Sequence, residues 1–555
     1  MRAVRRTARW SIDPACRARE RSAQDEFLRF QRAFGGSLGC RLAPTASDRP
    51  KALLSSSGVV GSVRVDLGLI KGLELAGFEP MVLMWDNPWL TQYYRLAGVD
   101  NVYCWEDFTG HAETQAAQAA VERMRSSDEL IQFQWAGIRV GRFAASTTLR
   151  QLRVGSLDLS EPEVRRHVTQ RIAAGLLHAR AAQRLIATVR PSVALFVDRG
   201  YTPQGELFDV CLEQGIDTIT WNGSHKSNAL ILKRYSTENR DAHPASLSAR
   251  TWEALRQMAW TPAHRERLQQ ELFQTYASGD WYSEVGTQFH TRLIEPEEVR
   301  RRLGLDPGKK TAVIFAHILW DGTFFWGRDL FGSYEEWLIE TVRAACANPR
   351  VNWIIKVHPA NQVKNVRDGV RGDYAEVIAL RRAIGSLPPH IVVMPAESEI
   401  NNYSLFPLID YGVTVRGTIG IETASFGIPV LTAGTGRYDH RGFTIDSESP
   451  HEYLDRLRRI HELPPLLPAQ RELAERFAYG VFVLRPFALK TLTFEFDIDA
   501  RATPRTSIRA VTKADWLNAP DLRAFASWAA DRRAEDFLMW PDQTTARPSA
   551  AVCAV

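Results

Sequence analysis

The chain has 555 residues, of which 45% are hydrophobic and 24% charged, and its formal net charge is +5 at pH 7. This is the composition of a folded globular protein, and the length exceeds one ordinary hydrophobic core, so at least two domains are expected. So small a net charge does not indicate a nucleic-acid partner, and no apolar run approaches the ~20 residues of a membrane span. The six cysteines form no Cys-x-x-Cys pair, which disfavours a disulfide framework and a cysteine zinc site.

The N-terminal 48 residues differ in composition from the rest of the chain. Six arginines lie among the first twenty residues without an apolar core, so the segment lacks the pattern of a secretory signal. We therefore expect a cytoplasmic protein with a basic N-terminal extension over residues 1–48. A solvated tail is the simpler interpretation of this extension, and peripheral contact with an anionic membrane surface is the alternative.

Residues 49–295 are predicted to form a first Rossmann-like domain. It opens with a strand at 51–55, a helix at 63–76 that Gly77 ends, and a second strand at 80–85. This β-α-β order is typical of a doubly wound sheet with helices on both faces. The glycine pattern of a dinucleotide site is absent after the first strand, so we predict no dinucleotide site there.

A helical insertion and two further strands complete this domain. Residues 112–189 are rich in alanine and contain a single proline, which predicts several helices. Strands at 192–197 and 217–221 end in polar clusters that contain Asp198 and His225. Because ligands of open α/β sheets bind beyond the carboxyl ends of the strands, both residues are candidates for the acceptor side of a cleft. A helix cap at Asp198 and a plain loop residue at His225 stay open as alternatives.

A linker with an Asp-Pro-Gly turn precedes a second Rossmann-like domain, which we place at residues 308–470. Its strands at 311–315, 351–357 and 391–394 alternate with helical segments, which again predicts a doubly wound sheet. Residues 471–555 are expected to form C-terminal helices and a tail. The predicted fold class is α/β, with two Rossmann-type domains that face a cleft and a helical C-terminal tail.

One strand end of the second domain carries groups that suit an anion. The strand at 351–357 ends in Lys356, His358 and Pro359. His358 can donate to a phosphate oxygen, and Lys356, two residues earlier on the same strand face, can add positive charge. The sequence therefore predicts a phosphate contact beyond this strand.

The loop after the strand at 311–315 contains His317, Asp321, Gly322 and Thr323. Asp321 is the one acid between residues 316 and 323, and it could take a proton from an attacking hydroxyl or orient a substrate. We therefore treat Asp321 as a candidate catalytic residue.

The stretch from 408 to 446 gives the strongest indication of a nucleotide site. A short strand is followed by a turn with Gly417, Thr418 and Gly420 and then by a short helix. The unpaired N–H groups and the dipole of a helix N-terminus favour an anion such as a phosphate. Glu422 lies four residues beyond Thr418 on the same helix face, where a carboxylate can accept hydrogen bonds from ribose hydroxyls. An ordinary α/β turn with a solvated Glu422 is the alternative.

Several common activities are disfavoured by missing motifs. The chain contains no P-loop lysine motif and no His-Glu-x-x-His, which removes the commonest NTPase and zinc protease sites. What remains is a protein of two sheet domains that holds a nucleotide in its second domain and admits a second substrate to its cleft. Nucleotide-sugar transfer fits this description best.

These motifs together resemble the capsular polysaccharide biosynthesis family, which are GT-B-fold glycosyltransferases akin to the Kdo transferases of bacterial capsule export systems. The segments that carry the resemblance are residues 356–359, residues 417–430, and Tyr438 with residues 442–444. The resemblance implies a GT-B-like fold and a metal-independent, inverting transferase that needs no cofactor. It also implies a CMP-, UDP- or GDP-linked sugar donor, a glycan or glycolipid acceptor, and contact with the inner membrane face or the capsule export machinery.

By the same resemblance, His358 would bind the donor phosphate, and Thr418 and Glu422 the nucleotide. Asp321 would act as the base, with Asp198 across the cleft as its rival, because Trp320 stands where some relatives have a second acid. The predicted catalytic residues are Asp321, His358 and Asp198. The predicted donor-binding residues are His317, Gly322, Thr323, Lys356, Pro359, Gly417, Thr418, Gly420, Glu422 and Tyr438.

Two other functions are compatible with this fold. A nucleotide-sugar 2-epimerase has the same two-domain shape, but it needs acids and a histidine placed for elimination at the sugar, and the sequence does not identify such a set. A non-catalytic polysaccharide assembly factor could keep the fold without turnover. Neither the donor sugar nor the acceptor follows from these residues.

Overall fold

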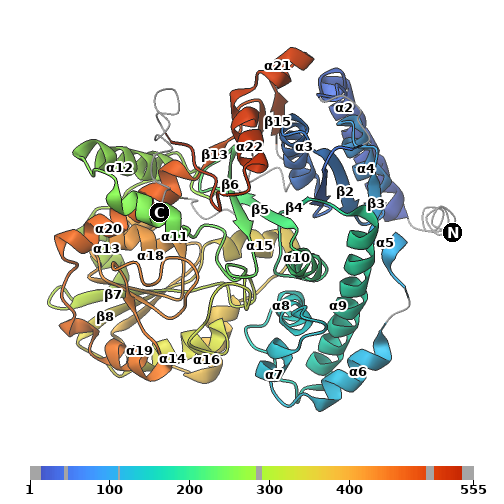
Figure 1. The fold of residues 1–555 in the computed structure, drawn as a ribbon. Coiled ribbons are helices and arrows are strands. Elements are labelled where there is room, and N and C mark those ends of the chain that lie inside the picture. Colours follow the sequence, from blue (N-terminus) through green and yellow to red (C-terminus); the bar gives the residue numbers. More distant parts are fainter. Residues whose placement is uncertain (1–13, 43–47, 111–112, 283–289, 496–504, 541–555) are drawn as a thin grey trace, which may run out of the picture.

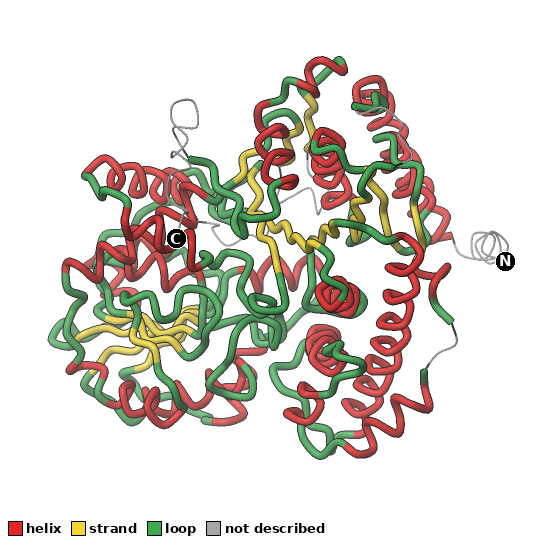
Figure 2. Tube along the Cα trace, in the orientation of Figure 1, coloured by secondary structure: helices red, strands yellow, loops and turns green. Residues whose placement is uncertain are grey.

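A computed structural model describes residues 14–42, 48–110, 113–282, 290–495 and 505–540 of the chain. Two sheets with helices on both sides make up two lobes that lie next to each other (Figures 1 and 2). This confirms the predicted α/β fold with two Rossmann-type domains.

The first sheet has seven strands in the order β13-β6-β5-β4-β1-β2-β3. Its strands β1 to β5 pair in parallel. At one edge β6 pairs antiparallel with β5, and β13 pairs antiparallel with β6. The strands are β1 (Lys51–Ser55), β2 (Glu79–Met84), β3 (Val102–Cys104), β4 (Val193–Phe196), β5 (Asp217–Gly223), β6 (Ala229–Tyr235) and β13 (Phe487–Ala488). The order in the chain reverses between β1 and β4, which marks a topological switch point.

Helices cover both faces of the first sheet (Figure 1). The helices of this lobe are α3 (Val60–Leu75), α4 (Pro88–Leu96), α5 (Trp105–Phe108), α6 (Thr114–Arg123), α7 (Ser127–Gln132), α8 (Val140–Leu152), α9 (Pro162–Val189) and α10 (Gln204–Glu213). Successive residues of β1 point to opposite faces, since Ala52 and Leu54 belong to one hydrophobic cluster and Leu53 to the other. The predicted helical insertion corresponds to α6 to α9.

Part of the predicted N-terminal extension belongs to this domain. Residues 1–13 lie outside the described part, and α2 (Pro14–Leu38) follows them. Phe27 and Phe30 of α2 are 6% and 4% exposed and meet Tyr93 of α4 at ring-centroid distances of 5.1 and 5.0 Å. Aromatic packing of this kind anchors a helix whose remaining surface is polar.

The second sheet has six strands in the order β12-β11-β10-β7-β8-β9, all paired in parallel. The strands are β7 (Lys310–Phe315), β8 (Val351–Lys356), β9 (Ile391–Met394), β10 (Tyr411–Thr414), β11 (Val430–Thr432) and β12 (Ile445–Asp446). Its helices are α13 (Pro296–Leu303), α14 (Tyr334–Cys346), α15 (Ala360–Asp368), α16 (Ala375–Ala383), α17 (Asn402–Leu405), α18 (Thr418–Ser425) and α19 (Pro450–Arg458). The chain order reverses between β7 and β10, so the site predicted after these strands lies at the switch point.

Three helices from different parts of the chain share one core with the second domain. α11 (Ala249–Gln257) and α12 (Pro262–Ala277) pack with α20 (Pro468–Tyr479). Their buried side chains, with Ile421 of α18, form one hydrophobic cluster that includes Trp252, Tyr276 and Phe477. The segment before the domain linker therefore reaches the wall of the second domain.

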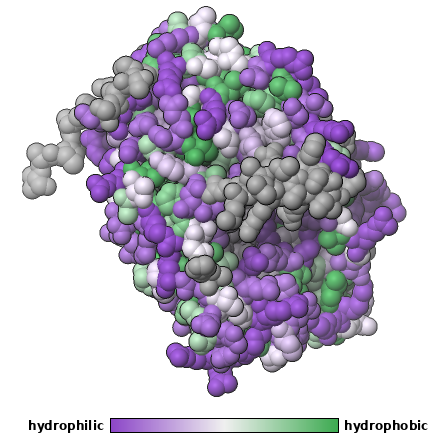
Figure 3. Space-filling model, turned by 90° about the vertical axis from the view of Figure 1, so that its right-hand side faces the viewer, coloured by the Kyte–Doolittle hydropathy of each residue, from purple (hydrophilic) through white to green (hydrophobic). Residues whose placement is uncertain are grey.

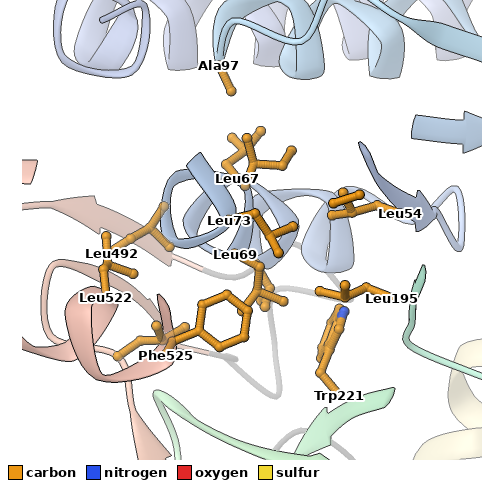
Figure 4. Packing of buried hydrophobic residues seen from close by; sticks show 14 of the residues in the cluster. Leu54, Leu67, Leu69, Leu73, Ala97, Leu195, Trp221, Leu492, Leu522 and Phe525 are labelled. Carbon is orange, nitrogen blue, oxygen red and sulfur yellow. The ribbon is translucent and has the colours of Figure 1, made fainter. Parts of the chain in front are cut away.

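The chain then returns to the first domain, which the sequence analysis does not predict. After a π-helical turn (Gly480–Leu484) and β13 come β14 (Leu492–Glu495), β15 (Arg505–Ile508), α21 (Lys513–Leu517) and α22 (Pro520–Ala530). Phe525 of α22 belongs to the same hydrophobic cluster as Leu69 and Leu73 of α3 (Figure 4). A Cβ added at Gly72 of α3 would lie 2.4 Å from the Phe525 ring. Lys233 of β6 pairs with the buried Asp536 at 2.9 Å.

No helix of the described residues has the length and apolar character required to cross a lipid bilayer. The face of the molecule in Figure 3 is mainly hydrophilic, with small separate hydrophobic patches between charged side chains. Scattered apolar residues of this kind are normal on protein surfaces.

We predict that Phe525→Ala lowers the free energy of unfolding by about 3–5 kcal/mol, because the ring is fully buried between α22 and α3. Urea unfolding followed by circular dichroism measures the change. Leu467→Ala, at a side chain that is 64% exposed, is the control and should change the value by less than about 0.5 kcal/mol. Equal effects of the two variants would show that α22 is not part of the cooperative core.

Candidate functional site

A cavity of about 280 Å³ lies at the carboxyl ends of β7, β8 and β10. Side chains of the second domain form most of its wall, and His243, Trp281 and Tyr282 close it from the other side. The predicted residues that line it are His317, Asp321, Lys356, His358, Pro359, Gly417, Thr418 and Glu422. The predicted residues that lie outside the lining are Gly322, Thr323, Gly420, Tyr438 and Asp198.

His317 joins the two strand ends at the switch point. Its Nε2 lies 3.1 Å from Thr414 Oγ1 and accepts a hydrogen bond from the Val415 N–H at 3.3 Å. The ring stacks on Tyr334 at a centroid distance of 4.6 Å. Burial, and then the nearby Arg416, hold the pKa of His317 well below its ordinary value, so the ring is neutral. His317 therefore positions the turn after β10.

His358 presents a neutral N–H group to the cavity. The backbone N–H of Ala360 donates to Nδ1 at 3.2 Å, so the ring proton is on Nε2. Burial, with Lys364 and Lys356 nearby, lowers the pKa of His358 to about 4. The imidazole is uncharged at neutral pH and can donate Nε2–H to an anionic oxygen.

Two cations in the cavity wall form no ion pair with a carboxylate of the described residues. Lys356 forms no ion pair with any described residue, and burial lowers its pKa to about 8. Arg437 is 8% exposed, donates to Thr418 Oγ1 at 2.5 Å and to the Arg416 carbonyl at 3.3 Å, and leaves Nε without a partner. Arg416, in contrast, pairs with Asp329. Unpaired buried cations at the end of a sheet are suited to bind an anion.

The turn before α18 adds backbone donors beside these cations. Gly417 is the N-cap of α18 and lines the cavity. The first backbone N–H groups of the helix therefore lie at the cavity and have no acceptor within the helix. Tyr438 stabilises the turn, because its hydroxyl donates a hydrogen bond to the Gly417 carbonyl at 2.8 Å. Gly420 makes room for it, since a Cβ there would lie 2.2 Å from the Tyr438 hydroxyl. Gly420 and Tyr438 thus shape the turn without lining the cavity.

Glu422 is 2% exposed and is held by Tyr276 of α12, whose hydroxyl bonds to Oε2. Asn402 donates to the same hydroxyl at 3.1 Å. Burial raises the pKa of Glu422 to about 8, although Tyr276 and Arg437 oppose the rise. The alternative of a solvated Glu422 is therefore wrong. No local sequence pattern indicates Tyr276 as part of the site, because it lies on a helix that precedes the domain linker.

Asp321 joins the two domains. Its Oδ1 accepts from the Tyr201 hydroxyl at 2.8 Å and its Oδ2 from Lys364 at 2.7 Å. Burial alone would raise the pKa of Asp321, but Lys364 and Arg150 outweigh it and lower the pKa to about 2. The loop continues this contact, since the Gly322 N–H donates to the Tyr201 hydroxyl at 3.0 Å.

The remaining predicted residues occupy different environments. Thr323 accepts a hydrogen bond from Ser146 of α8 at 2.7 Å through its carbonyl, so it belongs to the domain contact. The side chain of Asp198 is 42% exposed, and Oδ2 lies 4.0 Å from Arg150, which is also 4.0 Å from Asp321. His225 is 1% exposed and bonded to Glu271 at 2.9 Å, so the acceptor contact predicted for it is wrong: the ring is part of a core.

No family model matches the chain, and no curated protein matches it. Solved structures that match include two KpsC β-Kdo transferases of Thermosulfurimonas dismutans. The first is a 2,4 transferase with 15% identity and a TM-score of 0.32, over 59% of this chain and 88% of that chain. The second is a 2,7 transferase with 14% identity and a TM-score of 0.33, over 60% and 88%.

A putative UDP-N-acetylglucosamine 2-epimerase of Listeria monocytogenes matches with 13% identity and a TM-score of 0.29, over 77% of this chain and 90% of that chain. The Kdo transferases belong to the family that the sequence motifs resemble. With TM-scores below 0.5, these matches carry no inference about activity, which is drawn from the geometry of the cavity.

We predict that Glu422→Gln becomes more stable relative to the wild type as the pH rises. The folded wild type keeps a proton on Glu422 up to pH about 8, and the unfolded chain releases it near the ordinary pKa of 4.5. Wild-type stability therefore falls across this window, and the neutral amide avoids the loss. The difference should grow by at most about 1.4 kcal/mol per pH unit in urea unfolding. Glu448→Gln, at an exposed side chain, is the control and should show no such trend.

Proposed function

We propose that the protein is a glycosyltransferase that binds a nucleotide-activated sugar in this cavity and transfers the sugar to a hydroxyl of a glycan or glycolipid. One observation carries the proposal. The unpaired Arg437 and Lys356, the N–H group of His358 and the N-terminus of α18 surround one cavity at a Rossmann switch point, and Glu422 lies one helical turn deeper. A nucleoside phosphate presents its phosphate and ribose groups with this spacing.

In this proposal the donor lies against the second domain. His358 donates Nε2–H to a phosphoryl oxygen, and Lys356, Arg437 and the amides at Thr418 neutralise the remaining charge. Glu422 accepts hydrogen bonds from ribose hydroxyls through the oxygen that Tyr276 leaves open. These contacts suit CMP-, UDP- and GDP-linked donors alike. In this proposal the transfer uses no resident cofactor.

The transfer itself needs a base and a stabilised leaving group. An acceptor oxygen forms the new bond to the anomeric carbon, and the bond from that carbon to the phosphate oxygen breaks. The electron pair leaves with the nucleoside phosphate, whose new charge the cations of the cavity stabilise. Attack from the side opposite to the phosphate inverts the anomeric centre. The acceptor proton passes to the base.

We assign the base to Asp198 in preference to Asp321. Both oxygens of Asp321 already accept hydrogen bonds, and Lys364 holds its pKa at about 2, so it takes a proton poorly at neutral pH. Asp198 stands at the switch point of the first sheet and is partly exposed, and its Oδ2 lies 4.0 Å from Arg150, farther than either partner of Asp321. In this proposal Asp321 positions the two domains.

A direct binding test uses CMP, CDP, UDP and GDP in a thermal-shift panel against the wild type and His358→Ala. A nucleotide that binds the folded state raises the melting temperature by mass action. We expect at least one nucleotide to do so and His358→Ala to weaken its affinity about tenfold, as for loss of a hydrogen bond to a charged group. His451→Ala, at an exposed side chain outside the cavity, is the control. No shift at millimolar concentration for any of the four would contradict the donor site.

The base assignment predicts different results for two acids. Asp198→Asn should lower kcat for release of nucleoside phosphate from the sugar nucleotide by about 10²–10⁴-fold without changing nucleotide affinity. Asp321→Asn should lower the melting temperature, because Lys364 and Arg150 lose their shared carboxylate. Product analysis by mass spectrometry distinguishes sugar transfer from 2-epimerisation of the nucleotide sugar. Nucleotide binding without any turnover would favour the alternative of a non-catalytic polysaccharide assembly factor.

A further inference from the structure

A loop of the first domain is fixed directly to the second domain beside the cavity. It follows β6, and the N–H of His243 donates to the Gly436 carbonyl at 2.7 Å, while the Gly327 N–H donates to the Asp241 carbonyl at 2.7 Å. Gly436 has φ +96°, and an added Cβ would lie 2.8 Å from Gly327. The backbones of the two domains are therefore in contact at this point, with no side chain between them.

Two buried arginines hold the same loop from behind. Arg199, 3% exposed, donates to the Ala242 carbonyl at 2.6 Å. Arg485, fully buried, donates to the Pro244 carbonyl at 2.7 Å. A loop fixed by this many hydrogen bonds loses little further freedom when a ligand binds, so a side chain on it is pre-organised.

The side chain on this loop that lines the cavity is His243. The N–H of Ala245 donates to Nδ1 at 3.0 Å, which leaves the ring proton on Nε2. No described residue forms a hydrogen bond with Nε2. The ring is held edge-on against Trp326 at a centroid distance of 4.4 Å. Burial, and then Arg437 and Arg416, keep the pKa of His243 well below its ordinary value, so the ring is neutral.

His243 and His358 have the same local structure. Both stand in the tripeptide His-Pro-Ala, at residues 243–245 and 358–360. In both, the proline lacks an N–H, and the alanine N–H two residues on bonds to Nδ1. The result is the same tautomer, with Nε2–H directed away from the backbone. One copy belongs to each domain, and both line one cavity.

From this juxtaposition we infer that His243 is a binding residue of the donor site, which donates Nε2–H to an anionic oxygen of the nucleotide from the side of the first domain. The inference rests on the proposed function, and it adds a ligand group that lies outside the nucleotide-binding domain. A nucleotide bound in this way contacts both domains through its phosphate, whereas a nucleoside lacks the anionic oxygen that His243 would bind. Affinity for the phosphate therefore depends on His243, and affinity for the nucleoside does not.

The test is calorimetric titration of the full chain with UDP, CDP, GDP and CMP and with the matching nucleosides. His243→Ala should weaken the best nucleotide about tenfold or more and leave its nucleoside unchanged, because one hydrogen bond to a charged oxygen is lost. His243→Gln should recover most of this loss, since the Gln amide is another neutral N–H donor. His451→Ala, at an exposed side chain outside the cavity, is the control and should leave both affinities unchanged.

Three results would overturn the inference. Nucleotide affinity unchanged in His243→Ala, while His358→Ala weakens it, would show that the donor site exists without His243. An equal loss for nucleotide and nucleoside in both His243 variants would show a purely structural role. A loss in His451→Ala as large as in His243→Ala would show that the effect is not specific to the cavity. If no nucleotide binds the wild type, the proposed function itself fails, and this outcome is separate from the other three.

Discussion

A buried guanidinium that forms no ion pair with any described carboxylate lines the cavity. Arg437 is 8% exposed and has no ion pair with any described residue, and Lys356 faces the same space. Burying a charge is costly unless an opposite charge compensates it, as Asp329 compensates the neighbouring Arg416. His243, His317 and His358 of the wall are neutral, so they add hydrogen-bonding groups without adding to the uncompensated charge. The cavity is therefore organised for a ligand that brings the missing anion.

Asp321, the acid predicted from the loop after β7, forms part of the contact between the two domains. Asp321 is shared by Tyr201 of the first domain and Lys364 of the second, and Arg150 stands between it and Asp198. The same loop continues to Trp326 in the cavity wall. Domain position and cavity shape are thus coupled through one short segment, because a shift of Tyr201 against Lys364 would break the bonds of Asp321. An acidic residue after a strand indicates a functional region, but its bonding partners decide whether it can move a proton.

Sequence patterns were sufficient for the parts of the site that lie at strand ends. Hydrophobic runs and glycine positions predicted both sheets and placed His358 and Glu422 at one edge, since parallel strands end together. They did not predict Arg437, Tyr276 or His243, because these residues reach the cavity through turns and helices whose position depends on the packing of distant segments. The return of the chain to the first domain was missed for a related reason: strands of two to four residues have too short a hydrophobic pattern to recognise.

The two domains supply different kinds of groups to the cavity. The cations that line it, Lys356, Arg416 and Arg437, all come from the second domain, whereas the first domain contributes the neutral His243. A neutral hydrogen-bond donor adds a directed contact without increasing the electrostatic attraction for a phosphate. In the proposed transfer this difference affects turnover, because the leaving nucleoside phosphate carries more charge than the donor from which it forms, and each added cation would slow its release. Contact across the domain boundary by a neutral imidazole can orient the donor and still allow the product to leave.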